Sequence, residues 1–136
     1  MSRMPNREQR LRLDTLADHL RVIRNEFPDI RPNREDDDIL WFNEGLDAVD
    51  AGRLNLAERT FKKLVLAQPD HPDAYNGLTM VYQAHGFIAW ARLFADETIR
   101  LAQRAVDEGG MDQETLDDYI ALRASLYPET PKSPDP

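Results

Sequence analysis

The three histidines are the side chains best suited to bind a metal or to transfer a proton, but they lie far apart in the sequence. His19, His71 and His85 form no H-x3-H pair, and the sequence contains no cysteine. Zinc sites need closely placed histidine and cysteine ligands. We therefore expect no metal site. We interpret His71 as a solvated turn residue and His85 as a cation favoured by the dipole at a helix C-terminus.

Serine and carboxylate chemistry have no better support in the sequence. The serines, Ser2, Ser125 and Ser133, lie outside any G-x-S-x-G motif, and no glycine-rich phosphate loop is present. Adjacent carboxylates such as Asp117 and Asp118 point in different directions on a helix, which does not favour paired acid and base catalysis. We predict that the protein is not an enzyme and uses no cofactor.

Composition indicates one soluble domain. The 136 residues suffice for a single hydrophobic core. Without cysteine the chain suits a reducing compartment, and neither a signal-peptide h-region nor an apolar run of about 18 residues is present. We expect a cytoplasmic protein with no membrane partner.

Charge is distributed unevenly along the chain. Residues 1–34 carry a net charge of +3 and the remainder carries −11. An acidic body repels nucleic acid and attracts basic protein surfaces. Simple maintenance of solubility is the alternative explanation. The run at 35–38 favours the start of a helix over a calcium site, because no glycine-punctuated loop follows.

Apolar spacing predicts a helix over residues 6–27. Asn6 can cap it, and one apolar stripe follows. Residues 1–5 are expected to be disordered, and 28–37, with two prolines, to form a linker. The stripe consists of Leu13, Leu16, Leu20, Ile23 and Phe27.

The central segment contains residues that recur 34 positions apart. They predict helices over 38–51, 54–67, 72–85 and 88–108, with Gly52 and Gly86 in the left-handed conformation that ends a helix. Pro69 ends the second helix and Pro72 begins the third. The recurring pairs are Trp41 and Tyr75, Leu46 and Met80, Gly52 and Gly86, and Ala57 and Ala91.

These residues resemble the tetratricopeptide repeat pattern W-x2-L-G-x2-Y…A-x3-F…P. The resemblance covers residues 38–105, as two incomplete repeats of helices A and B. It implies an all-α helical-repeat fold in which Gly45 and Ala57 let the helices approach closely. The first repeat, 38–71, matches at Trp41, Gly45, Ala57, Phe61 and Pro69. The second, 72–105, matches at Tyr75, Leu78, Tyr82 and Ala91 and departs at Thr79, Ala95 and Gln103.

Flanking helices are expected at both ends, giving about six in all. The second repeat extends to residue 108 because its last helix, of about 20 residues, continues almost to Gly109. Asp112 can cap a final helix over 112–127 that closes the stack, and the proline-rich tail 128–136 is expected to be disordered.

The resemblance also implies a binding surface on the A helices, which line a concave groove in this family. The ligand-contacting positions map to Ile39, Phe42, Leu46 and Val49 and to Asp73, Asn76, Met80 and Gln83. We take Phe42, Leu46, Val49, Asn76, Met80 and Gln83 as the candidate partner-binding residues.

Three uses of this surface are open at this point. The N-terminal helix could cover Phe42, Leu46 and Val49 within its own chain. Alternatively, the groove takes a helix or extended peptide from a partner protein, and the chain acts as an adaptor, assembly factor or small chaperone. In the third, the N-terminal helix and first repeat form a homodimer.

Overall fold

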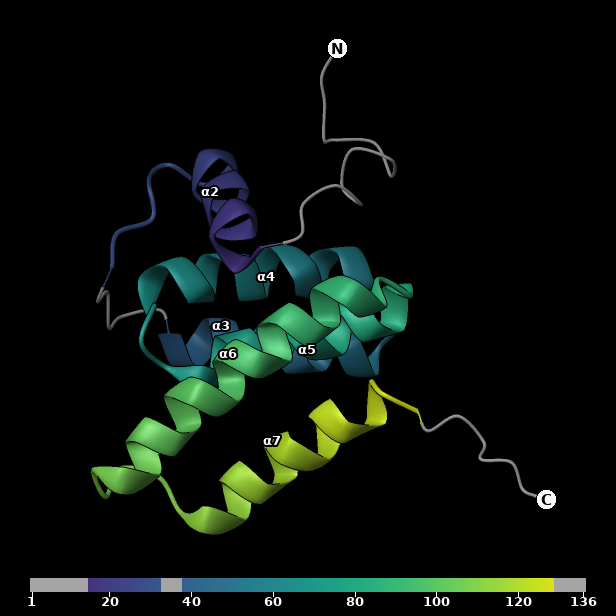
Figure 1. Cartoon of the computed structure of the whole chain (residues 1–136). Helices are drawn as coiled ribbons and strands as arrows, with labels where there is room; N and C mark the ends of the chain where they lie inside the picture. Colours follow the sequence, from purple (N-terminus) through teal and green to yellow (C-terminus); the bar gives the residue numbers. More distant parts are fainter. Residues whose placement is uncertain (1–14, 33–37, 129–136) are drawn as a thin grey trace, which may run out of the picture.

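The computed structural model describes residues 15–32 and 38–128, and helices joined by short turns are the only regular secondary structure in this part of the chain (Figure 1). The all-α prediction is confirmed, and the described residues contain six helices, as expected. The helices are α2 (Leu16–Glu26), α3 (Asp38–Asp50), α4 (Leu54–Ala67), α5 (Pro72–His85), α6 (Ile88–Asp107) and α7 (Gln113–Ser125).

Several helices begin and end at the residues that the sequence predicted for these positions. Gly52 and Gly86 have φ of 76° and 84°, the left-handed conformation, and Pro72 lies in the first turn of α5. The Asp112 carboxylate caps α7 by accepting from the Thr115 N–H at 2.9 Å. His71 is more than a turn residue, because its Nδ1 accepts from an N–H of the first turn of α5.

The N-terminal helix is shorter than predicted. Thr15 has extended backbone angles, and its hydroxyl caps α2 by accepting from the Asp18 N–H at 3.2 Å. The prediction of one uninterrupted helix over 6–27 is therefore wrong. It rested on apolar periodicity, which continues across Thr15 and does not indicate the break. The proposed cap at Asn6, the disordered ends 1–5 and 129–136, and residues 33–37 of the linker lie outside the described residues.

Phe61 joins the helices of the repeat segment. Its fully buried ring, on α4, lies against the backbones of α3 and α5, where Gly45 and Gly77 leave room for it. A Cβ at Gly45 would lie 2.6 Å from Phe61 Cζ, and a Cβ at Gly77 would lie closer still to the ring. The expected role of Gly45 is thus confirmed, and Gly77 is a second small residue that the repeat pattern does not contain.

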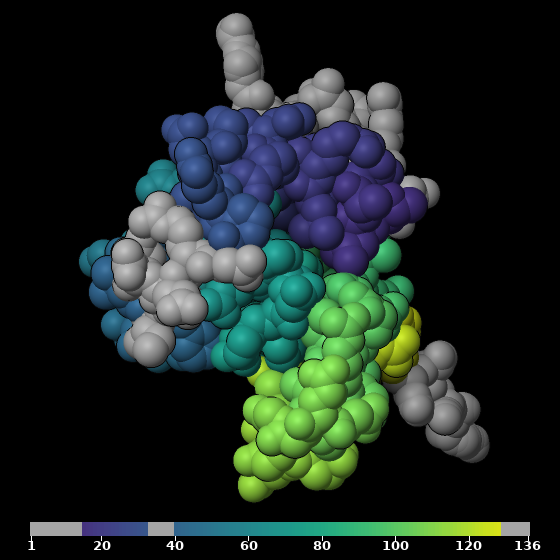
Figure 2. Space-filling model, turned by 90° about the vertical axis from the view of Figure 1, so that its left-hand side faces the viewer, coloured from purple at the N-terminus to yellow at the C-terminus, as the bar shows by residue number. Residues whose placement is uncertain are grey.

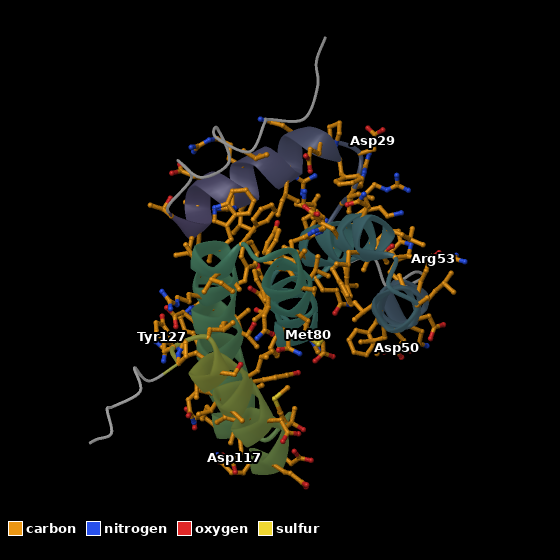
Figure 3. The ribbon with its side chains drawn as sticks, turned by 90° about the vertical axis from the view of Figure 1, so that its right-hand side faces the viewer. Asp29, Asp50, Arg53, Met80, Asp117 and Tyr127 are labelled. Carbon is orange, nitrogen blue, oxygen red and sulfur yellow. The ribbon has the colours of Figure 1, made fainter. Side chains whose placement is uncertain are left out.

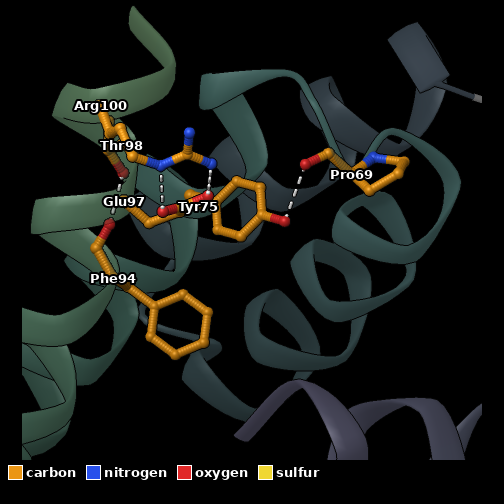
Figure 4. Close-up of polar contacts among 6 residues, drawn as sticks. All are labelled: Pro69, Tyr75, Phe94, Glu97, Thr98 and Arg100. Atoms are coloured by element: carbon orange, nitrogen blue, oxygen red, sulfur yellow. Dashed lines mark hydrogen bonds and ion pairs between the residues drawn. The ribbon is translucent and has the colours of Figure 1, made fainter. Parts of the chain in front are cut away.

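Polar groups in the core between α5 and α6 are satisfied locally (Figure 4). Tyr75 is buried, and its hydroxyl donates to the Pro69 carbonyl at 2.9 Å. Burial, followed by the charge of Glu97, raises the pKa of Tyr75. Thr98 donates to the Phe94 carbonyl at 2.7 Å. These bonds let polar residues occupy the core without an unpaired group.

Helix α2 packs on α4 and α6, with which it shares one side of the molecule (Figure 2). Buried Ile23 joins the core, and the His19 ring lies 4.3 Å from that of Trp90, edge to face. At the other end of α2, Lys62 of α4 donates to Glu26 at 3.0 Å and pairs with buried Glu58 at 2.9 Å.

Helix α7 closes the opposite end of the chain. Leu116 and Leu126 are buried, and Arg92 of α6 donates through Nε and Nη2 to the Leu126 carbonyl at 2.9 and 2.7 Å. The Arg92 and Arg123 guanidinium groups lie over the Tyr127 ring. These contacts fix the direction in which α7 returns along the molecule.

Candidate partner-binding site

The six predicted partner-binding residues lie on two neighbouring helices, and all six are half-buried. Spacings of three and four residues place the members from each helix on one stripe. Because α3 and α5 both contact Phe61, the two stripes lie on adjacent helices. We call this surface the A-helix face. It comprises Phe42, Leu46 and Val49 of α3 and Asn76, Met80 and Gln83 of α5.

The α3 part of the A-helix face is apolar and rests on the core. Phe42, Leu46 and Val49 pack against buried residues, and the Phe42 and Phe61 rings meet edge to face with centroids 6.5 Å apart. Core contacts hold one side of each residue while the other stays in water. This arrangement gives a preformed apolar surface.

The α5 part of the face is more polar. Met80 lies between Asp50 of α3 and Asp117 of α7, on the side of the molecule away from α2 (Figure 3). Asn76 and Gln83 present amides on either side of Met80 in the same stripe. A flexible thioether flanked by amides can contact both apolar and main-chain polar groups of a ligand.

Helix α7 contacts both ends of the α5 stripe, which the sequence analysis missed. The Tyr119 hydroxyl donates to Asp73 Oδ1 at 2.7 Å, and Gln83 Nε2 donates to Ser125 Oγ at 3.4 Å. Leu122, half-buried, lies midway between Tyr119 and Ser125 on α7. The spacing of 119, 122 and 125 was a readable signal for a shared face, but the sequence did not show which helix that face would meet.

The hydrogen bond to Asp73 has an electrostatic consequence. Burial, then the bond to Asp73, then the charges of Asp73 and Asp118 raise the pKa of Tyr119, so its hydroxyl stays protonated and continues to donate. Asp73 is thereby engaged within the chain. Of the positions expected to meet a ligand on α5, Asn76 and Met80 have no side-chain hydrogen bond to α7, whereas Asp73 and Gln83 do.

The expectation that the N-terminal helix covers the A-helix face is wrong for its described part. The α2 stripe meets the aromatic rings of Tyr82, Trp90 and Phe94 instead, through His19. In Figure 3, α2 lies along the top of the molecule, and the labelled Met80 lies below α5, on the side of that helix away from α2. From the sequence alone, the apolar stripe of α2 could have packed on either side of the molecule. The ion pair between Lys62 and Glu26 holds α2 beside α4. Leu13 lies outside the described residues, as do the side chains of Asp38 and Ile39.

Outside this face, the titratable side chains of His85, Glu58 and Lys62 lie close together. His85 Nε2 lies 3.5 Å from Glu58 Oε1, and Lys62 also pairs with Glu58. Among the described residues, no three His, Asp or Glu side chains are placed to hold a metal ion together. The A-helix face, where half-buried apolar side chains of α3 lie beside Met80 of α5, is therefore taken as the candidate site.

Comparisons with known proteins add no relative. No family model matches the sequence, and neither the curated proteins nor the solved structures yield a significant match. Across the described residues, every helix is too short or too polar to cross a membrane.

Proposed function

We propose that this protein is a non-catalytic binding module related to tetratricopeptide repeats, which holds a helix or extended segment of a partner protein on its A-helix face. Its work would be that of an adaptor, assembly factor or small chaperone. One observation supports the proposal most strongly. Three large apolar side chains of α3 and Met80 of α5 are only partly buried on adjacent helices, and α2 packs elsewhere.

Physical reasoning favours a ligand over a purely structural role for this surface. A half-exposed apolar stripe that already rests on a rigid core needs little reorganisation to bind. Asn76 offers an amide to the main chain of an extended segment, and Met80 adapts to apolar side chains. An enzyme would instead need a nucleophile beside a base, and a cytoplasmic location accords with the absence of cysteine.

The homodimer is the less favoured alternative. It would use the apolar stripe of the N-terminal helix, but Ile23 is buried against the core of its own chain. Leu16, Leu20 and Phe27 also pack on that core. A dimer through this helix would have to displace these contacts.

The test uses the double variant Leu46→Glu, Met80→Glu in partner capture from the source cells. We expect capture of specific proteins to fall more than about tenfold, because two charges would be buried in the interface. Circular dichroism should show helicity close to that of the parent, since both residues are half-exposed.

Leu40→Glu with Ile120→Glu is a matched control. These side chains are 63% and 44% exposed. Leu40 lies two residues before Phe42 and points to another side of α3, and Ile120 lies on α7, which contributes no residue to the A-helix face. The control adds the same charge and should leave capture unchanged. Equal losses for both double variants, or no loss for either, would contradict the proposal.

A further inference from the structure

The charges of the chain are sorted between the two sides of the molecule. From residue 40 onward, α3, α5 and α7 together carry seven carboxylates and a single arginine, while α4 and α6 carry four carboxylates and six Lys or Arg. The arginine, Arg123, is paired with Asp96 of α6. The carboxylates on α3, α5 and α7 are Glu44, Asp47, Asp50, Asp73, Glu114, Asp117 and Asp118.

Several of these carboxylates border the A-helix face. Asp50 is four residues after Leu46 and directly after Val49, so it adjoins the apolar stripe of α3. Asp47 lies beside Asp50 at the same border, three residues earlier. On α7, Asp118 is four residues before Leu122, and its charge reaches the Tyr119 hydroxyl at the end of the α5 stripe. The apolar surface therefore has carboxylates on both flanks.

These flanking carboxylates are available to a ligand. Within the described part of the chain, no Lys or Arg forms an ion pair with Asp47, Asp50 or Asp118. Asp47, Asp50 and Asp118 are also exposed. Like charges on neighbouring elements repel one another, so a cationic ligand would relieve that repulsion as well as add attraction.

From this arrangement we infer that the A-helix face takes a cationic amphipathic segment of a partner protein. The apolar side chains of that segment lie on the α3 stripe and Met80, and its Lys or Arg residues reach the carboxylates of α3 and α7. This inference rests on the proposed function and specifies the partner chemistry. Charge would set the selectivity and the rate of association, while the apolar contacts hold the segment.

The test measures fluorescence anisotropy of three labelled peptides of 18 residues against the full chain. The first has a Leu stripe at helical spacing with Lys on both flanks. The second replaces each Lys by Glu, and the third keeps Lys and replaces each Leu by Ser. We expect the Lys and Leu peptide to bind at least about tenfold more tightly than either of the others. Its affinity should fall as salt rises from 50 to 300 mM, because added ions screen exposed charges.

Matched variants locate the effect. Asp47→Asn, Asp50→Asn and Asp118→Asn together should reduce the preference for Lys over Glu peptide severalfold. The control neutralises three exposed carboxylates elsewhere, Asp29→Asn, Asp70→Asn and Glu108→Gln, with the same change in net charge. It should retain the preference. An equal reduction in both variants, or in neither, would overturn the inference.

The outcomes separate this inference from the proposed function. If Lys and Glu peptides bind equally and both are lost in the Leu46→Glu, Met80→Glu variant, the face binds ligands but charge does not select them. If no peptide binds, both ideas fail. Light scattering provides the remaining outcome: a dimer that the same double variant converts to monomer would identify a second copy of the chain as the occupant, and would overturn the inference.

Discussion

At the scale of single residues, the position of one ring organises the interior. Phe61 lies against two glycines, one on each neighbouring helix, with no room for a methyl group at either. The repeat pattern predicted Gly45 because it contains a small residue there. It did not predict Gly77, since the pattern places a small residue at 79, and only the packed position of the Phe61 ring shows that 77 must also be small.

Gly77→Ala tests this packing. At an unobstructed helix position the change would stabilise by up to about 1 kcal/mol. Here the added Cβ collides with the Phe61 ring, so we expect a net loss of about 1–3 kcal/mol in the free energy of unfolding. Urea denaturation gives the value.

A second substitution shows whether the ring is the cause. Phe61→Leu shortens the side chain, so Gly77→Ala should cost less in that background than in the parent. Gly110→Ala is the control, because its Cβ would meet only the Ala105 carbonyl oxygen, at 3.7 Å. An unchanged or raised stability in Gly77→Ala would show that the ring can move aside.

Buried charge is a second feature at this scale. Lys62 and Glu58 are both buried, and the ammonium lies 2.9 Å from the carboxylate and 3.0 Å from that of Glu26. Lys62→Ala removes this cation from beside a buried carboxylate. We expect a loss of about 3 kcal/mol in unfolding free energy.

The neighbouring lysine is the natural comparison. Lys63 lies 5.0 Å from the centroid of the Trp41 ring and is less buried, so Lys63→Ala should cost only about 0.5–1 kcal/mol. Comparable losses for the two alanine variants in urea denaturation would refute a special role for the Lys62 pairs.

At the scale of helices, the residues that begin and end them were mostly readable from sequence. The glycines in the left-handed conformation, Pro72 and Asp112 all act as expected, because these are local effects that need no knowledge of packing. The start of α2 was missed because the apolar spacing continues across Thr15, although Thr15 with Asp18 three residues later matches a helix-capping pattern. The side on which α2 packs was not readable either, because it depends on contacts with Trp90 of α6 and Lys62 of α4.

The cap of α7 makes a pH-dependent prediction. The backbone and side-chain bonds from Thr115 lower the pKa of Asp112 in the folded state. A carboxyl group with a lowered pKa contributes stability above its unfolded value, near 3.8, and loses it as pH falls through the folded value. Asp112→Ala should therefore lower the urea midpoint at pH 7.

The same measurement at low pH supplies the check. Below the folded pKa of Asp112, the parent also lacks the charge, so its advantage over Asp112→Ala should shrink. Asp112→Asn keeps a capping oxygen and should fall between the two at pH 7. An advantage of the parent that stays constant between about pH 2.5 and 7, on either side of the ordinary aspartate pKa of about 4, would contradict the role given to the ionised cap.

At the scale of the whole molecule, α2 packs beside α4 and α6, whereas Met80 of the A-helix face lies on the side of α5 away from α2 (Figure 3). The repeat resemblance selected the six residues of the face, and all six are half-buried in the structure; their part in binding stays a prediction. It could not predict the contribution of α7, because the bonds of Tyr119 and Ser125 join residues more than 40 positions apart. It also could not show that carboxylates gather on one side, since that depends on which helices share a side.

The most direct measurement is NMR titration of the isotope-labelled full chain with the Lys and Leu peptide. Binding on the A-helix face predicts that the amide signals of Leu46, Met80 and Gln83 shift in proportion to occupancy, while those of Ile23 and Lys62 stay in place. Shifts confined to α2 and α4, with the A-helix face unaffected, would contradict the account.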